Sequence, residues 1–241
     1  FIDCVQLLKQ NNAGIRNTPG TKIVNLAKGE VLYTPPEGEG RIRDMLSDLE
    51  KFMHDESGLD PLIKLPLMHY QFEAIHPFID GNGRTGRILN LLFLTLHGLL
   101  DYPVLYLSKF IIENKNDYYK LLRGITSNQE WEPWILYMLD GIEETAIYSR
   151  DKILAIKELM DTTVDKARDL LPNKVFSKEL IELLFERPYT KIQHLVDKDI
   201  AKRETASMYL KELESVHLLK SQRVGKELLY LNTGLFELLS D

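Results

Sequence analysis

The chain has 241 residues, of which 44% are hydrophobic and 27% are charged, and its formal net charge is −6. The length allows one large domain or two unequal ones, and the composition is that of an ordinary globular protein. The charge excludes a global field that would favour nucleic acid or an anionic membrane surface. The single cysteine, Cys4, excludes an internal disulfide and a cysteine-built zinc site, and predicts a cytoplasmic protein.

The first predicted elements are a helix end, a hairpin and three helices. The first twelve residues resemble the end of a helix, and the start at Phe1 instead of Met indicates a fragment of a longer protein. KIVNL and EVLYT flank AKG, which predicts a β-hairpin with Gly29 at its turn. Apolar residues at helical spacing predict helices at 40–55, 62–75 and 84–100.

Further helices are predicted at about 108–125, 131–149 and 151–170. The longest apolar run, 88–100, is too short to cross a bilayer, so no membrane association is expected. We expect a mainly α fold. Its first domain covers 1–170, with a core at about 20–150 and a linking helix at about 151–170, and its second domain covers 174–241.

The second domain is predicted to contain three helices, from SKELIELLFERP, TKIQHLVDKD and KRETASMYLKELESVHLL, followed by a ribbon that turns at Gly225-Lys226. This order resembles a winged helix-turn-helix. Residues 174–241 contain eleven Lys+Arg and eleven Asp+Glu, whereas strong phosphate binders are usually basic. A protein-docking or dimerisation role is therefore preferred over DNA binding.

The stretch HPFIDGNGRTGR, residues 76–87, lies between two apolar helical segments. Pro77 ends the incoming helix, and the glycines of Gly81–Gly83 let successive backbone N–H groups face one side. The next helix is predicted to begin near Arg84, so its N-terminal dipole faces the same concavity and forms an anion site. Arg84 and Arg87 share a helix face and are suited to grip separate phosphates.

Two further groups of this stretch are suited to chemistry on a phosphate. Asp80 is a hard oxygen ligand of the kind that Mg²⁺ prefers. His76 has an ordinary pKa of about 6.5, so that a neutral imidazole is available as a base at neutral pH. The combination predicts phosphoryl or nucleotidyl transfer to a hydroxyl.

HPFIDGNGRTGR matches every defined position of H-x-F-x-D/E-G-N-G-R-x-x-R, the signature of Fic domains. Other segments are similar to bacterial Fic protein adenylyltransferases over about residues 1–150: AGIRNTPGTKI, YTPPEGEGRI, HYQFEAIHPF, LYLSKFI, DYYKLL and EWEPWI. The resemblance implies a Fic-type helical bundle with a β-hairpin flap, to which a winged helix is a common appendage.

The resemblance also implies roles in AMP transfer from ATP. His76 would deprotonate the target hydroxyl, which attacks the α-phosphorus as pyrophosphate leaves, and Asp80 would hold Mg²⁺. The N–H groups around Asn82 and its side chain would bind the phosphates, and Arg84 and Arg87 would neutralise their β/γ end. The implied nucleotide-binding residues of this loop are Asp80, Gly81, Asn82, Gly83, Arg84, Thr85, Gly86 and Arg87.

Other segments have implied roles as well. Tyr118 and Tyr119 match the tyrosine pair that lines the adenine pocket, with Thr126 where relatives often have asparagine and Asn128 out of register. Gly83 favours AMP transfer, because the Doc-like kinases have lysine there. The flap residues that would cover the nucleotide and align the target segment are Glu30, Val31, Leu32 and Tyr33.

Two further features of the sequence bear on the resemblance: the position of Glu73 and the absence of an inhibitory motif. Glu73 is one turn before His76 and is suited to orient it, although a structural helix role is preferred. The inhibitory S/T-x-x-x-E-G/N motif of many members is absent from the sequence. We expect such a helix upstream of Phe1 or in a partner, unless the enzyme is constitutively active.

Three functions remain open at this point. The first is a protein adenylyltransferase that modifies Ser, Thr or Tyr of a target docked on the flap, with self-modification and a homodimer as further expectations. The second keeps the fold but removes AMP or transfers another phosphate-linked group, since fold alone does not fix chemistry. The third is a transcriptional regulator in which a nucleotide-sensing Fic-like part controls a DNA-binding winged helix.

Overall fold

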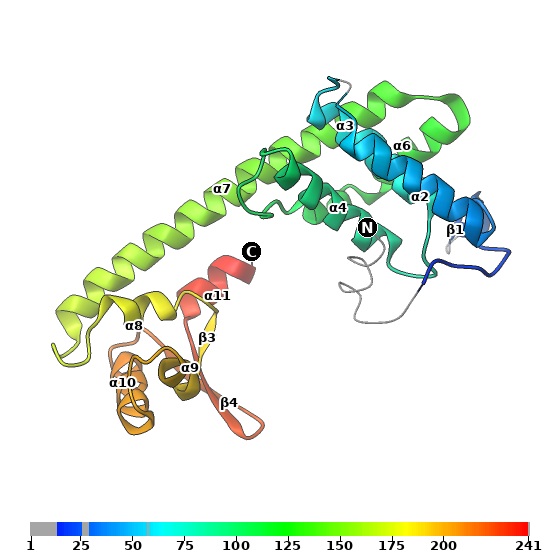
Figure 1. The fold of residues 1–241 in the computed structure, drawn as a ribbon. Helices are drawn as coiled ribbons and strands as arrows, with labels where there is room; N and C mark the ends of the chain where they lie inside the picture. Colours follow the sequence, from blue (N-terminus) through cyan, green and yellow to red (C-terminus); the bar gives the residue numbers. More distant parts are fainter. Residues whose placement is uncertain (1–13, 26–28, 57, 241) are drawn as a thin grey trace. The chain divides into compact units, whose positions relative to one another are not determined.

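The computed structural model describes residues 14–25, 29–56 and 58–240, and it divides the chain into two compact units, Phe1–Ser149 and Arg150–Asp241 (Figure 1). The helix end expected in the first twelve residues lies outside the described residues. The fold is mainly helical with two small antiparallel sheets, as predicted. In the described part of the chain, no helix combines the length and the apolar character needed to cross a membrane.

The predicted hairpin is present in the first unit. Strand β1 (Ile23–Asn25) pairs antiparallel with β2 (Glu30–Tyr33), with Ile23 opposite Tyr33. Gly29 has a φ of 64°, a left-handed conformation that glycine adopts without steric cost, which explains why the chain turns there. The described sheet has only these two strands, so each keeps one edge that no other described strand covers.

Three helices form the body of the first unit: α2 (Glu39–His54), α3 (Pro61–Ile75) and α4 (Asn82–Leu96). The α3 helix begins after Asp60, whose side chain accepts a hydrogen bond from Leu62 N at 2.8 Å, and it packs against both α2 and α4 (Figure 1). Helix α4 starts and ends earlier than the helix predicted at 84–100. Gly98, with a φ of 68°, turns the chain away after its end.

The next helices differ from the prediction in two places. The helix expected at 108–125 is two helices, α5 (Leu107–Glu113) and α6 (Lys115–Asn128), with Asn114 between them. The Asn114 side chain donates to Phe110 O at 3.0 Å, a local bond of the kind that competes with helix continuation. The two helices expected at 131–149 and 151–170 are one, α7 (Trp131–Leu170), since neither Gly nor Pro occurs in residues 142–170, where the break was expected.

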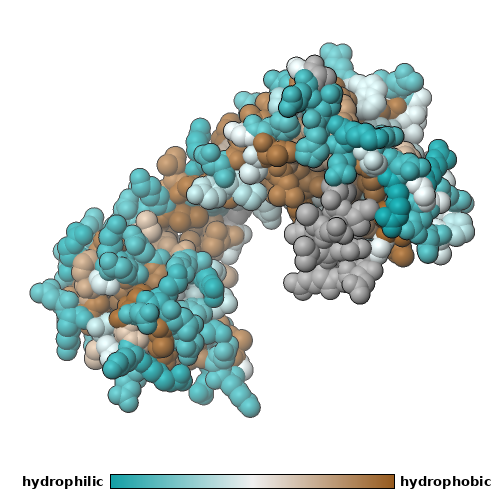
Figure 2. Space-filling view, in the orientation of Figure 1, coloured by the Kyte–Doolittle hydropathy of each residue, from teal (hydrophilic) through white to brown (hydrophobic). Residues whose placement is uncertain are grey.

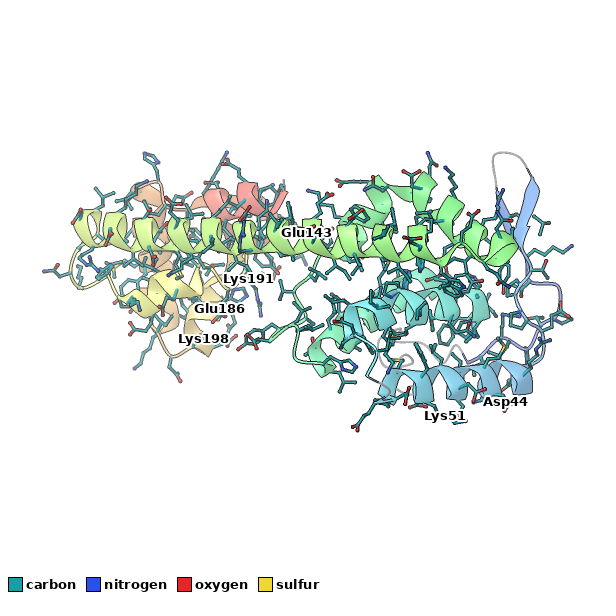
Figure 3. The ribbon with its side chains drawn as sticks, turned by 90° about the horizontal axis from the view of Figure 1, so that it is seen from above. Asp44, Lys51, Glu143, Glu186, Lys191 and Lys198 are labelled. Atoms are coloured by element: carbon teal, nitrogen blue, oxygen red, sulfur yellow. The ribbon has the colours of Figure 1, made fainter. Side chains whose placement is uncertain are left out.

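The core of the first unit forms where α3 meets the start of α7. Trp134 is fully buried, donates from Nε1 to Pro66 O at 2.9 Å and stacks on His69 with ring centroids 6.0 Å apart. The outer side of α2 is polar, and Asp44 and Lys51 project from it (Figure 3). This division into an apolar inner and a polar outer face is the pattern that predicted the helix.

The second unit has its own core, built on the last part of α7. Its further elements are α8 (Lys178–Leu183), β3 (Tyr189–Thr190), α9 (Ile192–Asp197), α10 (Arg203–Ser215), β4 (Lys220–Val224), β5 (Glu227–Leu231) and α11 (Thr233–Ser240). The three predicted helices and the ribbon are confirmed, with Gly225 at a φ of 60° in the turn. Strand β3, which pairs with β5, and α11 were not predicted. The winged-helix assignment stays a prediction.

The surface of the second unit mixes charged and apolar residues. Glu186 and Lys198, labelled in Figure 3, form an ion pair that connects the segment after α8 to the end of α9. Exposed apolar side chains lie on α7, where Ile153 and Leu154 each keep more than half of their surface, and brown patches are visible along this helix in Figure 2.

Candidate active site

A cavity of about 350 Å³ lies in the first unit. Residues from the β-hairpin, α3, α4, α5 and α6 contribute to its wall. Four residues singled out in the motif or beside it, Glu73, His76, Gly83 and Arg87, lie on this wall together with Tyr118 and Tyr119. The cavity therefore brings together segments that are up to about a hundred positions apart in the sequence.

His76 ends α3 in a left-handed conformation, with φ 48° and ψ 58°, and its backbone N–H donates to Phe72 O at 3.0 Å. Pro77 follows and prevents the helix from continuing. Burial lowers the pKa of the His76 imidazole, and the nearby Glu73 backbone opposes this shift. Among the described residues, the buried Nδ1 has no hydrogen-bond partner of normal geometry. The ring is therefore neutral at neutral pH.

Arg16, which the sequence reasoning did not single out, holds the turn after α3. Its side chain is 2% exposed; Nε donates to His76 O at 2.7 Å, and Nη2 donates to Ile75 O at 3.2 Å and to Pro36 O. Its backbone N–H donates to Pro77 O at 2.9 Å. One buried guanidinium thus connects the turn that carries the candidate base to the segment that follows the hairpin.

The loop before α4 is braced by Asn82. Its side-chain Oδ1 accepts from Phe78 N at 2.8 Å and its Nδ2 donates to Phe78 O at 2.7 Å, so this amide is used inside the loop and is not directed to a phosphate as expected. Gly81 is left-handed with φ 81°, but Gly83 lies in the first helical turn. The helix thus begins two residues earlier than predicted, and its first N–H groups have no acceptor within the helix.

Thr85 and Gly86 make contacts inside the fold instead of facing the cavity. The Thr85 hydroxyl donates to Gly81 O at 2.9 Å, one turn back. Gly86 is buried where α4 crosses α3, and a Cβ placed there would lie 2.7 Å from Glu73 Oε1 and 3.1 Å from Phe72 Cδ1. Gly86 thus allows the close crossing of α3 and α4, Thr85 braces the start of α4, and neither lies on the cavity wall.

Substitution of Gly86 by alanine is expected to lower the free energy of unfolding by about 1 to 3 kcal/mol, because the added methyl group overpacks the crossing of α3 and α4. The matched control is Gly40→Ala in α2, where nothing lies within 4 Å of the added Cβ. Alanine there is expected to raise the same free energy by up to about 1 kcal/mol. Urea unfolding of both variants measures the two signs, and equal effects would contradict the packing argument.

The two arginines of the motif have different environments. Arg84 forms an exposed ion pair with Asp80, with Nη2 and Oδ2 3.1 Å apart, and neither residue lies on the cavity wall. Arg87 does lie on it, and its Nε donates to Ser108 Oγ at 3.0 Å. The pair predicted to grip separate phosphates is thus divided, and Arg87 is the arginine of the motif that lies on the cavity wall.

A metal ion has one candidate ligand in this region. In the described ranges, no group of three or more His, Cys, Asp or Glu is arranged to hold a metal. Asp80 alone fits Mg²⁺ only in the form common for nucleotide enzymes, in which phosphates and water supply most of the ligands. Its pairing with Arg84 would then have to be exchanged for the ion.

Helix α6 supplies one aromatic wall. Tyr118 is 4% exposed and lies within hydrogen-bond distance of His69 Nε2, at 2.9 Å, while the more exposed Tyr119 packs edge-on to it at 5.3 Å. Thr126 lies on the same wall, where its hydroxyl is 3.1 Å from Tyr70 Oη. Asn128 instead donates to Glu130. Thr126 therefore provides a small hydroxyl group at the position where relatives often have asparagine. Asn128 does not take its place.

The hairpin forms the remaining side. Ile23 and Tyr33 lie on the cavity wall, and burial raises the pKa of the Tyr33 phenol. Val31, two residues before Tyr33 in β2, is 46% exposed and does not lie on the cavity wall. For Glu30 and Leu32 only the backbone is described, and it belongs to β2. Of the predicted flap residues whose side chains are described, Tyr33 lies on the cavity wall and Val31 does not.

Several wall residues were missed by the sequence reasoning, although their spacing contains a signal. Lys115, Leu122 and Arg123 repeat with the tyrosine pair and Thr126 at intervals of three and four, which places them on one face of α6. A helical-face search starting from Tyr118 would have found them. Arg16 has no such signal, because its contacts depend on three segments that meet only in the fold.

Comparison with known proteins agrees with this geometry. Residues 4–94 match the Fic/DOC family, and residues 159–235 match the C-terminal domain of protein adenylyltransferase SoFic-like proteins. Over 112 residues, 46% of this chain, it is 33% identical to protein adenylyltransferase Fic of Drosophila yakuba and 31% identical to that of Drosophila melanogaster. The chain spans about a fifth of the length of these relatives, 21%.

The fold has a match among crystal structures. A Fic family protein from Desulfovibrio desulfuricans G20 superposes with a TM-score of 0.50 at 20% identity, over 95% of this chain and 67% of that one. At this identity the likeness concerns the fold alone. The chain therefore contains a Fic/DOC family domain at residues 4–94 and a SoFic-like C-terminal domain at residues 159–235.

Proposed function

We propose that this chain transfers AMP from ATP to a hydroxyl group of a protein. The observation that carries the proposal is that His76, with a lowered pKa, shares one cavity with Arg87 and Gly83 at the start of α4 and with the tyrosine wall of α6. A base, an anion site and an aromatic surface for a nucleobase are the three parts that nucleotidyl transfer needs. Relatives named protein adenylyltransferases support the same reaction.

In the proposed reaction, the neutral His76 imidazole accepts the proton of the target Ser, Thr or Tyr hydroxyl. The hydroxyl oxygen forms a bond to the α-phosphorus of ATP, and the bond from that phosphorus to the bridging oxygen breaks. Pyrophosphate leaves with the electron pair of the broken bond. The backbone N–H groups of the first turn of α4 and the Arg87 guanidinium balance the charge of the departing phosphates.

The remaining parts of the proposal concern the metal and the target. Mg²⁺ held by Asp80 would supply charge neutralisation on the phosphates. The target would pair with the uncovered edge of β2, which binds extended segments through backbone hydrogen bonds. Self-modification and a homodimer are part of the same proposal. For the second unit, whose charges balance, we propose docking of a protein in preference to DNA.

The experiment incubates the chain with Mg²⁺, a cell lysate and ATP labelled at either the α- or the γ-phosphate. Label from the α-position on protein supports AMP transfer, whereas label from the γ-position alone would indicate a kinase. If neither label is transferred, release of AMP from a pre-adenylylated protein would favour the second function, AMP removal. Sequence-specific DNA binding that survives substitution of His76 would instead favour a regulator.

A further inference from the structure

Glu73 is a carboxyl group of the cavity that the proposed reaction does not use. It lies on α3 one turn before His76, and its Oε1 is buried without a hydrogen-bond partner in the described part of the chain. A buried polar atom without a partner costs free energy, so it is uncommon in folded proteins unless a ligand or a proton satisfies it. The residue also lies on the cavity wall, where a ligand can reach it.

The carboxyl group lies beside Gly83 and Gly86 of α4, close to the guanidinium of Arg87. A Cβ placed on Gly83 would be 3.8 Å from Glu73 Oε1 and 3.2 Å from Arg87 Nη1, so both groups approach the same point at the start of the helix. This point is where the first N–H groups of α4 favour an anion. An ionised Glu73 would therefore repel a phosphate at the place where Arg87 attracts it.

Two histidines and two tyrosines around Glu73 are neutral at neutral pH. His69, from the same helix, has a pKa lowered to about 4 by burial, and burial also lowers the pKa of His76. From α6, Tyr118 and Tyr119 have raised pKa values because they are buried. From α4, the charged Arg87 acts on Glu73, and the charged Lys115 and Arg123 of α6 lie on the same cavity wall. The balance of charge at the site thus depends on the protonation of Glu73.

We propose that Glu73 belongs to the nucleotide site, and that it takes up a proton when a polyphosphate binds beside Arg87, so that the neutral carboxyl donates a hydrogen bond to a phosphate oxygen. This inference deepens the proposed function, because it concerns the same cavity. Burial raises the pKa of Glu73 to about 7, with Arg87 acting in the opposite direction. A phosphate would offset the effect of Arg87 and raise this pKa further.

The protonation of Glu73 determines how the affinity for a polyphosphate depends on pH. Above pH 7 the free carboxyl is mostly ionised, so binding must add a proton, and affinity falls as the pH rises. Below pH 7 the carboxyl is already mostly protonated, so the dependence disappears. By linkage, the number of protons taken up at pH 8 approaches one and decreases toward pH 6.

The test is isothermal titration calorimetry at pH 8 with α,β-methylene-ATP, and with inorganic tripolyphosphate as a second probe, in buffers of different ionisation enthalpy. The wild-type chain is expected to take up close to one proton per bound ligand, and Glu73→Gln none. The control Glu50→Gln, on the exposed side of α2, is expected to behave like wild type. Uptake that survives in Glu73→Gln would assign the proton to another group, His76 first, and overturn the proposal.

The outcomes also separate this inference from the proposed function. Absence of proton uptake in wild type, or of binding by both probes, overturns it whether or not AMP transfer occurs. Proton-linked binding without AMP transfer supports it and contradicts the reaction. Folding of Glu73→Gln is checked by thermal unfolding at pH 5 and pH 8, because the amide mimics the protonated acid in size. Relative to Glu73→Gln, the wild-type chain is expected to lose stability from pH 5 to pH 8, because both chains share the histidines and only the wild type ionises Glu73.

Discussion

Replacing His76 by alanine is expected to lower the rate of AMP transfer by about 10²- to 10⁴-fold, the usual contribution of a positioned general base. Nucleotide affinity is expected to stay within a few-fold of wild type, because Arg87 and the start of α4 remain. Incorporation of label from α-labelled ATP measures the rate, and calorimetric binding of α,β-methylene-ATP measures affinity. A parallel loss of both would indicate a role in binding instead.

The pH profile gives an independent readout of the same residue. Since burial lowers the pKa of His76 below its ordinary value, the ring stays neutral over most of the working range, and the rate is expected to fall only below about pH 6.5. His54→Ala, at the exposed end of α2, is the matched control and is expected to leave the rate unchanged. A wild-type profile without an acidic limb would argue against His76 as the base.

Much of the fold was predictable because local signals agreed with the tertiary structure. Apolar periodicity located α2, α3 and α4 within a few residues, and glycine located both hairpin turns. The errors occur where a tertiary contact or a single side-chain hydrogen bond determines whether a segment is a strand or where a helix ends. Strand β3 has two residues and exists only because β5 pairs with it, and Asn114 divides α5 from α6 through one side-chain bond.

The sequence predicted which residues belong to the candidate site, but not which of them face the cavity and which support the fold. The motif gave His76 and Arg87 correctly as neighbours, since both lie on one cavity wall. It did not show that the Asn82 amide braces Phe78, or that Arg84 pairs with Asp80 outside the cavity. A motif records which residue types are needed together. Burial and hydrogen bonding, which assign each to the ligand or to the scaffold, depend on the packing of α3 on α4.

Arg16 is the clearest case of a residue whose importance appears only in three dimensions. Its guanidinium is buried and donates to three backbone carbonyl groups, those of Pro36, Ile75 and His76. These carbonyls lie at the end of a helix and in a loop, where no regular backbone ladder provides donors for them. Because His76 adopts a left-handed conformation, its position depends on such external support.

Arg16→Met is therefore expected to lower the free energy of unfolding by about 3 kcal/mol or more, since removal of a buried charged donor leaves its partners unsatisfied. This corresponds to a decrease of roughly 6 to 12 °C in the Tm of the first unit. AMP transfer is expected to fall more than nucleotide affinity, because the guanidinium holds the turn with His76 and does not lie on the cavity wall. The control, Arg43→Met, removes an exposed pair with Glu39 and is expected to change the same free energy by about 0.5 kcal/mol at most. Equal effects of the two substitutions in thermal unfolding would show that the buried hydrogen bonds of Arg16 do not hold the turn, and that the position of the imidazole is fixed by the packing of α3 alone.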